Sequence, residues 1–169
     1  MKILLKHEEI VEISKQMAEK ITKNYANSNL VMVCVLKGAC PFHSELIKHI
    51  NLDMLVDYIQ VKSYDGRETS GTIEIKKDLD YDISGKDVIV VEDIVDTGLT
   101  LTHLKKELEK RNPKSLAFAT LLNKPSRRKV DFSPDYVGKT IDNLFVYGFG
   151  LDLDEKCRNL KDIYVVDDK

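Results

Sequence analysis

The sequence predicts an α/β domain with a largely parallel sheet flanked by helices. Helix-like and strand-like segments alternate along the chain, as they do when crossover helices join parallel strands. The strand candidates are short, continuous apolar runs, which are typical of strands buried on both faces. The length of 169 residues suits a single domain, residues 1–169, with one sizeable core.

The first third of the chain reads as helix, strand and helix. Residues 7–26 carry apolar side chains at helical spacing, which predicts an amphipathic helix. The apolar run "LVMVCVL", residues 30–36, then predicts a buried strand. Pro41 suits the first turn of a second helix that extends to Ile50.

The middle of the chain continues this alternation. Residues 55–76 read as two strands joined by the polar loop "DGRETSG", because apolar and polar residues alternate on either side of it. Residues 86–93 predict the next buried strand, and a helix starting near Leu99 follows it. Residues 115–122 form another apolar run and predict a further buried strand.

The last third contains short strand-like segments at 144–149 and 163–167 and no clear helix. Ligands of open α/β sheets gather at the carboxyl ends of the strands. We therefore expect a small carboxyl-terminal hood over that edge, formed mainly by residues of about 124–169 and the amino terminus.

The composition narrows the function classes. A formal net charge of -2 argues against a broad nucleic-acid or membrane surface, although basic residues gather locally at "NKPSRRK". Cys34, Cys40 and Cys157 are too few and too irregularly spaced for a disulfide framework or a zinc site. Cys34 is expected to be a buried free thiol. No signal peptide or membrane-length apolar run occurs, so the cytoplasm is the expected location.

The stretch "VIVVEDIVDTGLT", residues 88–100, ends an apolar strand with acids and a turn. Ionised carboxylates accept hydrogen bonds but donate none, so Glu92 and Asp93 need hydroxyl donors or a cation such as Mg²⁺. The Gly98 turn opens a helix, and free N–H groups at a helix start bind anions. A phosphorylated sugar satisfies both requirements. The alternative is that the acids only cap the helix and Gly98 only serves the turn.

This stretch resembles the phosphoribosyl-diphosphate signature of the type I phosphoribosyltransferases: two apolar pairs, two acids, then Asp-Thr-Gly-x-Thr. The resemblance implies the type I phosphoribosyltransferase fold. It also implies that Glu92 and Asp93 contact the ribose hydroxyls or their magnesium. The 5′-phosphate would be held by the residues of the turn, Asp96, Thr97, Gly98, Leu99 and Thr100. Neither a G-x-x-x-x-G-K-[ST] loop nor a G-x-G-x-x-G turn occurs, which excludes those two nucleotide-binding classes.

Two further segments resemble parts of the purine phosphoribosyltransferases. Lys37 and Gly38 resemble the Leu-Lys-Gly loop that binds pyrophosphate, in which the Leu-Lys peptide is often cis. The other reading is an ordinary glycine turn with a solvated lysine. Ser63 and Tyr64 begin a loop that resembles the flexible catalytic loop, whose closure would keep water from the reacting centre. Alone, that loop reads as a plain hairpin tip.

The carboxyl-terminal third contains the candidate base reader. Lys124 donates hydrogen bonds only, which favours a 6-oxo purine over a 6-amino one. Phe145 offers a stacking face and the Val146 backbone an acceptor, while Asp152 and Arg158 offer an acid and a phosphate donor. Taken singly, Phe145 is expected in the core and the two charged residues on the surface. Together these residues resemble the hypoxanthine-guanine phosphoribosyltransferase pattern, in which Arg158, with Lys37 and Gly38, would bind pyrophosphate.

This resemblance implies transfer of ribose 5-phosphate from 5-phosphoribosyl diphosphate to N9 of hypoxanthine or guanine. The products would be IMP or GMP and pyrophosphate. Asp96, near N7 by resemblance, is then the candidate general acid/base. The candidate Mg²⁺ ligands are Glu92, Asp93 and Asp152, and a homodimer or homotetramer is expected.

Three alternatives come from other readings of the same residues. A xanthine-preferring relative is the nearest one. A phosphoribosyl-diphosphate sensor that binds RNA or DNA would need a basic face, which the near-neutral charge does not favour. A passive nucleotide-binding module would leave Lys37 and the closing loop without a role.

Overall fold

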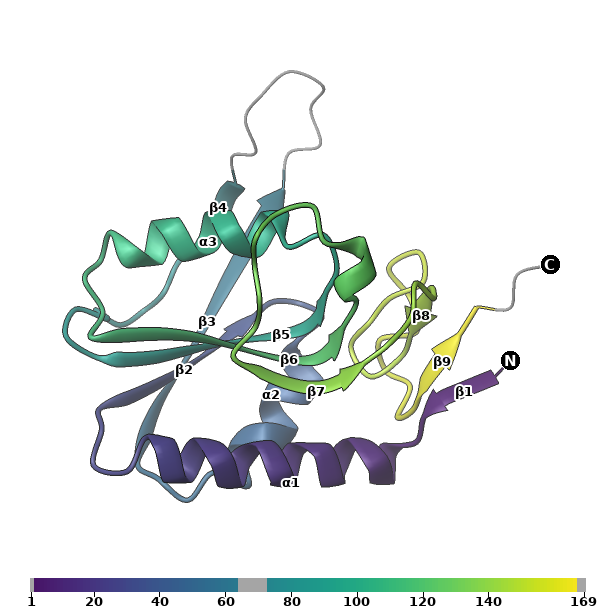
Figure 1. Cartoon of the computed structure of the whole chain (residues 1–169), viewed down its shortest axis with the longest axis horizontal. Helices are drawn as coiled ribbons and strands as arrows, with labels where there is room; N and C mark the ends of the chain where they lie inside the picture. The colour runs from purple at the N-terminus through teal and green to yellow at the C-terminus, as the bar shows by residue number, and fades with distance from the viewer. Residues whose placement is uncertain (1, 64–72, 167–169) are drawn as a thin grey trace.

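A sheet of six strands runs through the centre of the molecule, in the order β4-β3-β2-β5-β6-β7 (Figure 1). The computed structural model describes residues 2–63 and 73–166. Neighbouring strands from β3 to β7 run parallel, and β4 runs antiparallel to β3 at one edge. The predicted largely parallel sheet is therefore confirmed. Its strands are β2 (Leu30–Val35), β3 (Met54–Ser63), β4 (Ile73–Lys77), β5 (Asp87–Val95), β6 (Ser115–Asn123) and β7 (Tyr136–Thr140).

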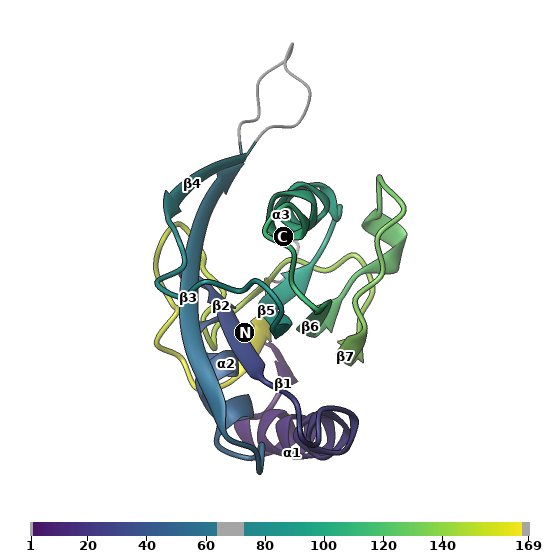
Figure 2. The same cartoon turned by 90° about the vertical axis from the view of Figure 1, so that its left-hand side faces the viewer.

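Helices cover both faces of this sheet. α1 and α2 lie on one side of it and α3 lies on the other, as Figures 1 and 2 show from two directions. Each helix buries one apolar stripe, so the sheet is shielded from water on both sides. The helices are α1 (His7–Asn24), α2 (Cys40–Ile47) and α3 (Leu99–Glu109), and a 3₁₀ turn, η1 (Pro125–Arg127), follows β6.

Side chains along β2 alternate between two cores. Val31 and Val33 pack in the cluster that contains the leucines of α3. Leu30 and Met32 pack in the cluster shared with α1 and α2. Successive side chains of a strand point to opposite faces, so a strand between two helical layers must be apolar throughout. This is the reason for the continuous apolar run in the sequence.

Two boundaries differ from the sequence prediction. α2 ends at Ile47 rather than Ile50, because the last backbone bonds tighten to i→i−3 spacing, as in Ile50 N–H to the Ile47 carbonyl at 3.3 Å. β5 continues through Glu92 and Asp93 to Val95, since its pairing with β6 extends that far. The predicted strand ended at Asp93, so the two acids lie near its carboxyl end as expected, and the strand runs two residues further.

A second, smaller sheet forms the hood. It consists of three antiparallel strands in the order β1-β9-β8. The strands come from opposite ends of the chain and lie side by side at the right of Figure 1. Among the described residues β8 is an edge strand of this sheet. The strands are β1 (Lys2–Leu5), β8 (Val146–Tyr147) and β9 (Ile163–Val165).

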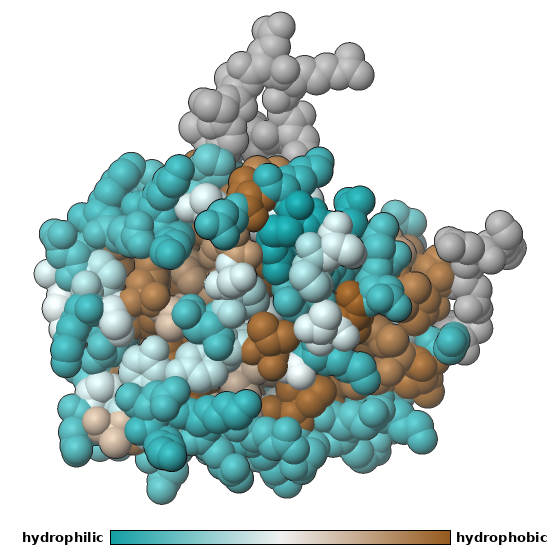
Figure 3. All heavy atoms as spheres, viewed as in Figure 1, coloured by the Kyte–Doolittle hydropathy of each residue, from teal (hydrophilic) through white to brown (hydrophobic). Residues whose placement is uncertain are grey.

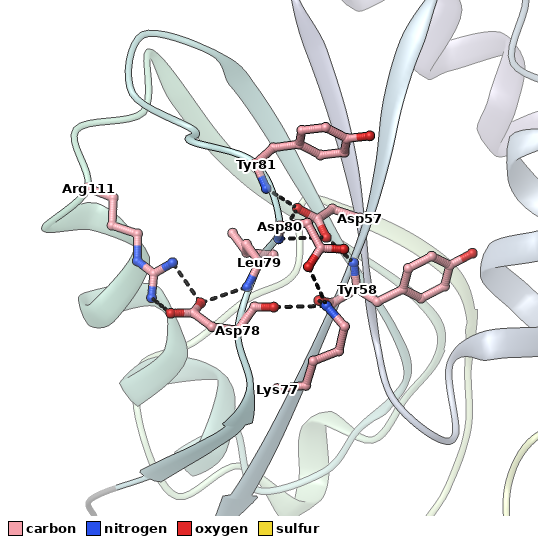
Figure 4. A network of polar contacts seen from close by, with 8 residues as sticks. All are labelled: Asp57, Tyr58, Lys77, Asp78, Leu79, Asp80, Tyr81 and Arg111. Atoms are coloured by element: carbon pink, nitrogen blue, oxygen red, sulfur yellow. Dashed lines mark hydrogen bonds and ion pairs between the residues drawn. The ribbon is translucent and has the colours of Figure 1, made fainter.

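A buried carboxylate fixes the connection between β4 and β5 (Figure 4). Asp57 is 1% exposed. Its side chain accepts the backbone N–H groups of Asp80 at 2.9 Å and of Tyr81 at 3.0 Å. Nearby, Arg111 at the end of α3 donates two hydrogen bonds to Asp78, at 2.7 and 3.0 Å. These contacts tie the base of the β3–β4 hairpin to the far end of α3.

The surface is mixed in character. In the view of Figure 3, hydrophilic side chains cover α1 and α3, whereas apolar side chains gather at the right, over the hood. No helix among residues 2–63 and 73–166 is long and apolar enough to cross a membrane. Cys34 is a buried free thiol, as expected.

Candidate active site

The predicted functional residues lie at the carboxyl ends of parallel strands. β2 leads into Lys37 and Gly38, β5 carries the acid pair, and β6 leads into Lys124. β3, parallel to β2, ends at Ser63. Because parallel neighbours end at the same side of a sheet, these segments meet at one edge. Tyr64 and the rest of the predicted catalytic loop lie outside the described residues.

A cavity of about 200 Å³ lies at the end of β5. Its floor is the turn into α3, where Gly98 adopts a φ of 80°, a left-handed conformation that glycine takes without strain. The Thr97 hydroxyl accepts the Leu99 N–H at 3.3 Å. Leu99 itself does not line the cavity, and its side chain is 38% exposed. The lining residues are Glu92, Asp93, Ile94, Val95, Asp96, Thr97, Gly98, Thr100 and Leu101.

The segment after β6 holds this turn in place. The Arg128 guanidinium donates to the Asp96 carbonyl at 2.6 Å and to the Val95 carbonyl at 3.2 Å. It also donates to the Asn123 side chain. The Lys129 N–H donates to the Thr97 carbonyl at 2.9 Å. Sequence reasoning missed Arg128 as a site residue, and the basic cluster "NKPSRRK" was the one signal that pointed to it.

The acid pair is held close together in the protein. The Asp93 N–H donates to the Glu92 carboxylate at 3.0 Å, and the Ile94 N–H donates to the Asp93 carboxylate at 2.6 Å. Burial and the neighbouring Asp93 charge raise the pKa of Glu92, and burial raises the pKa of Asp93. In the part of the chain that the structure describes, no cation lies within ion-pairing distance of either carboxylate. The pair therefore favours a ligand that brings positive charge or hydroxyl donors.

The third predicted metal ligand is engaged elsewhere. Asp152 forms an ion pair with Arg158 at 3.0 Å. Within residues 2–63 and 73–166 no group of three or more His, Cys, Asp or Glu side chains is placed to hold a metal ion. Glu92, Asp93 and Asp152 thus do not form a ready-made metal centre. Glu92 and Asp93 still fit Mg²⁺ as partial donors, since it is bound by one or two carboxylates together with phosphate oxygens and water.

Asp96 faces two cations from the segment after β6. Arg127 Nε donates to its carboxylate at 3.0 Å. Lys124 Nζ lies 4.0 Å from its other oxygen. Lys124 is 6% exposed, and burial lowers the pKa of its ammonium group. A buried lysine beside an acid that lines the cavity is placed to donate a hydrogen bond to a ligand.

The loop after β2 packs between the acid pair and the hood. The Leu36–Lys37 peptide is cis, as in the loop that the sequence resembles. A Cβ on Gly150 would overlap the Gly38 carbonyl, so the hood touches this loop through bare backbone. Arg158 donates to the Gly150 carbonyl at 2.8 Å, and its buried Nε has no hydrogen-bond partner among the described residues. A buried donor without a partner costs free energy, so the position of this guanidinium is maintained by its other contacts.

The predicted stacking residue is exposed. Phe145 is 60% accessible, so the reading that places it in the core is wrong: it stands at the open edge of the hood. Its carbonyl accepts the Val166 N–H at 2.9 Å. Because antiparallel bonding alternates along a strand, the backbone of Val146 then faces the opposite side, where β8 is an edge. Val146 can therefore offer its carbonyl to a ligand.

Comparisons with known proteins agree with this geometry. The model of the phosphoribosyl transferase domain matches residues 1–154. A hypoxanthine-guanine phosphoribosyltransferase of Streptococcus thermophilus is 49% identical over 160 residues, covering 94% of this chain and 89% of that protein. The crystal structure of a hypoxanthine phosphoribosyltransferase from Staphylococcus aureus superposes with a TM-score of 0.96 at 43% identity, covering 99% of this chain and 91% of that one. A hypoxanthine-guanine phosphoribosyltransferase from Bacillus anthracis gives 0.94 at 44% identity, covering 98% of each chain.

Proposed function

Because this chain belongs to the hypoxanthine-guanine phosphoribosyltransferase family, we propose that it transfers ribose 5-phosphate from 5-phosphoribosyl diphosphate to N9 of hypoxanthine or guanine. The products are IMP or GMP and pyrophosphate. The observation that carries the proposal is the meeting of three segments at one sheet edge: the acid pair with its phosphate turn, the Lys37–Gly38 loop and Lys124. The cytoplasmic location and the homodimer or homotetramer stay predictions.

The phosphoribosyl group is bound by the end of β5 and the turn that follows. The backbone N–H groups and hydroxyls of residues 97–100 hold the 5′-phosphate, supported by the start of α3. Glu92 and Asp93 accept hydrogen bonds from the ribose hydroxyls. The same two carboxylates would hold Mg²⁺, and Asp152, which pairs with Arg158 in the free protein, is the third candidate ligand. The ion would supply charge neutralisation for the leaving diphosphate.

The diphosphate lies between the loop after β2 and the hood. Lys37 and the Gly38 N–H approach it from one side. Arg158 approaches it from the other through its guanidinium group. These groups stabilise the negative charge that collects on the diphosphate as the bond to the anomeric carbon breaks.

The purine lies under the hood. Phe145 stacks on the base, and the Val146 carbonyl accepts from a ring N–H or an amino group. Lys124 donates a hydrogen bond to O6. In a 6-amino purine the amino group, which is also a donor, would face the lysine ammonium group instead. Asp96, next to Lys124, acts as general acid/base at N7.

The proposed reaction is tested by direct assay. The purified full chain, with phosphoribosyl diphosphate and magnesium, is given hypoxanthine, guanine, xanthine, adenine or uracil, and nucleotide formation is followed. Turnover of hypoxanthine and guanine is expected. A clear preference for xanthine would favour the xanthine-preferring alternative, and substrate binding without turnover of any base would favour a sensor.

The role of Asp96 is tested by Asp96→Asn. Loss of acid/base help should lower kcat by roughly 10²-fold or more with little change in KM. Asp131→Asn, which removes the same charge at an exposed position of the same region, serves as the control. A near-wild-type rate for Asp96→Asn would remove Asp96 from this role.

A further inference from the structure

One carboxylate oxygen contacts both cations of the proposed diphosphate subsite. Glu155 Oε2 lies 3.4 Å from Lys37 Nζ and 3.4 Å from Arg158 Nη2. Lys37 belongs to the loop after β2 and Arg158 to the hood, so Glu155 bridges two segments that are far apart in sequence. A single anion thus lies between the two groups that would otherwise receive an oxygen of the diphosphate.

The backbone places Glu155 there through a tight turn. Leu153 and Lys156 exchange N–H···O bonds of 3.0 and 3.1 Å. Between them, Asp154 and Glu155 have φ values of 52° and 61°. This is the geometry of a type I′ turn, which favours Asn and Gly over Glu. The Glu155 N–H also donates to the Asp152 side chain at 3.1 Å, so the position of the carboxylate is set by the backbone of the turn.

The three charged groups differ in their freedom to move. The side chains of Lys37 and Glu155 are 63% and 72% exposed. Arg158 is 26% exposed and keeps two other partners, Asp152 and the Gly150 carbonyl. Glu155 can therefore swing into water without leaving Arg158 unpaired. Exposed ion pairs are weak, which makes the bridge easy to displace.

We propose that Glu155 is the internal counter-anion of the diphosphate subsite. In the free protein its carboxylate holds Lys37 and Arg158, and a diphosphate binds by displacing it. The inference rests on the proposed function, because it takes Lys37 and Arg158 as diphosphate ligands. Its consequence is that Glu155 weakens binding of both 5-phosphoribosyl diphosphate and pyrophosphate, and so favours release of the product.

Two variants that remove the same charge test this inference. Glu155→Gln removes the competing anion and keeps the size of the side chain. Asp154→Asn removes one negative charge at the adjacent turn residue and suits its left-handed conformation. Binding of magnesium pyrophosphate to the full chain is measured by calorimetry, and KM is measured for phosphoribosyl diphosphate and for hypoxanthine.

Glu155→Gln should bind pyrophosphate about three- to tenfold more tightly, as expected for the loss of two exposed ion pairs. KM for phosphoribosyl diphosphate should fall in parallel, and KM for hypoxanthine should not change. Asp154→Asn should match the wild type. Glu155→Asn, whose residue type suits the turn, should reproduce the effect, which separates charge from folding.

Lys37→Met distinguishes the inference from the function on which it rests. If Lys37→Met weakens pyrophosphate binding while Glu155→Gln leaves it unchanged or weaker, Glu155 is not a competing anion, although the subsite stands. If Lys37→Met leaves pyrophosphate binding unchanged, the diphosphate role of Lys37 itself is wrong. If Glu155→Gln and Asp154→Asn raise the affinity for pyrophosphate equally, the effect comes from the loss of any negative charge in this region. That result would also overturn the inference.

Discussion

Gly38 lies in direct contact with the carboxylate of Asp93. A Cβ atom on residue 38 would overlap Oδ2 of Asp93. The loop after β2 and the acids of β5 therefore form one continuous wall of the site. On its other side the same loop meets the hood, where a Cβ on Gly150 would overlap the Gly38 carbonyl.

Gly38→Ala should disturb this wall without changing any charged group. We expect kcat/KM to fall by about 10²-fold, since displacing catalytic groups by about 1 Å can cost that much. Overpacking should also lower the free energy of unfolding by about 1–3 kcal/mol. Steady-state kinetics and thermal unfolding measure the two effects.

Gly85→Ala is the matched control. Gly85 has a φ of 70°, and a Cβ there would meet no atom within 4 Å. This variant should lose stability through backbone strain and keep its kcat/KM. Wild-type kcat/KM in Gly38→Ala would mean that the contact with Asp93 is not needed for catalysis.

Removal of divalent metal should abolish turnover. Glu92 and Asp93 lie side by side, and no cation of the described residues lies within ion-pairing distance of either. A bound diphosphate would add negative charge next to them. We expect no nucleotide formation in excess chelator and recovery on addition of Mg²⁺. Full turnover in the chelator would contradict the assignment of these acids to a metal.

Glu92→Gln should stabilise the metal-free protein while it impairs catalysis. Burial and the Asp93 charge raise the pKa of Glu92 in the folded state. A raised pKa favours folding below the unfolded pKa, and this contribution is lost as pH rises through the folded value. At neutral pH the glutamate therefore costs stability, and glutamine removes that cost.

The measurement is Tm of the metal-free protein at two pH values. Glu92→Gln should have a higher Tm than the wild type at neutral pH, and the gain should shrink near pH ~4, where an ordinary glutamate is about half protonated. Glu19→Gln, at an exposed position of α1, should show no gain. A lower Tm for Glu92→Gln at neutral pH would show that the charge is compensated in the fold.

Lys124→Gln should relax the preference for 6-oxo purines. In the wild type, adenine would leave the buried ammonium group without an acceptor, which costs at least about 1–3 kcal/mol. The variant should use hypoxanthine and guanine poorly and discriminate less against adenine. The ratio of kcat/KM values for the three bases measures this. Lys129→Gln, an exposed lysine of the same segment, should keep the wild-type ratio.

Arg128→Gln should loosen the turn that is proposed to bind phosphate. It removes the donor to the Asp96 carbonyl and one of two donors to the Val95 carbonyl, which also accepts the Lys124 N–H, and an unsatisfied carbonyl costs about 1–3 kcal/mol of stability. KM for phosphoribosyl diphosphate should rise. Arg127→Gln is the comparison, since Arg127 contacts only the Asp96 side chain in the contacts described above. It should change catalysis and spare stability, and equal losses of stability in both variants would refute a specific clamp by Arg128.

The sequence predicted those parts of the fold and site that are determined by residues close together in the chain. A strand between two helical layers must be apolar throughout, so residues 30–35 were readable as a strand without any partner. The Asp-Thr-Gly turn could be predicted because a left-handed conformation at the start of a helix favours glycine, and Gly98 has that conformation.

Features that depend on distant partners were not readable. The two carbonyls that accept from Arg128 lie more than thirty residues earlier in the chain, and a basic cluster does not reveal which carbonyls it will contact. β7 and β1 are short strands whose partners decide their structure. The exposure of Phe145 also depends on strand pairing. A single apolar residue is most often in the core, and the edge position of β8 is what exposes this one.

The pairing of β1 with β9 has a consequence for the order in which the protein is made. β1 leaves the ribosome first, but its partner strand, Ile163–Val165, is translated about 160 residues later. Until then β8 also lacks the neighbour that aligns it. A nascent chain can thus complete the turn proposed to bind phosphate before β8, the strand proposed to face the purine, gains its partner, so the two halves of the proposed site form at different times.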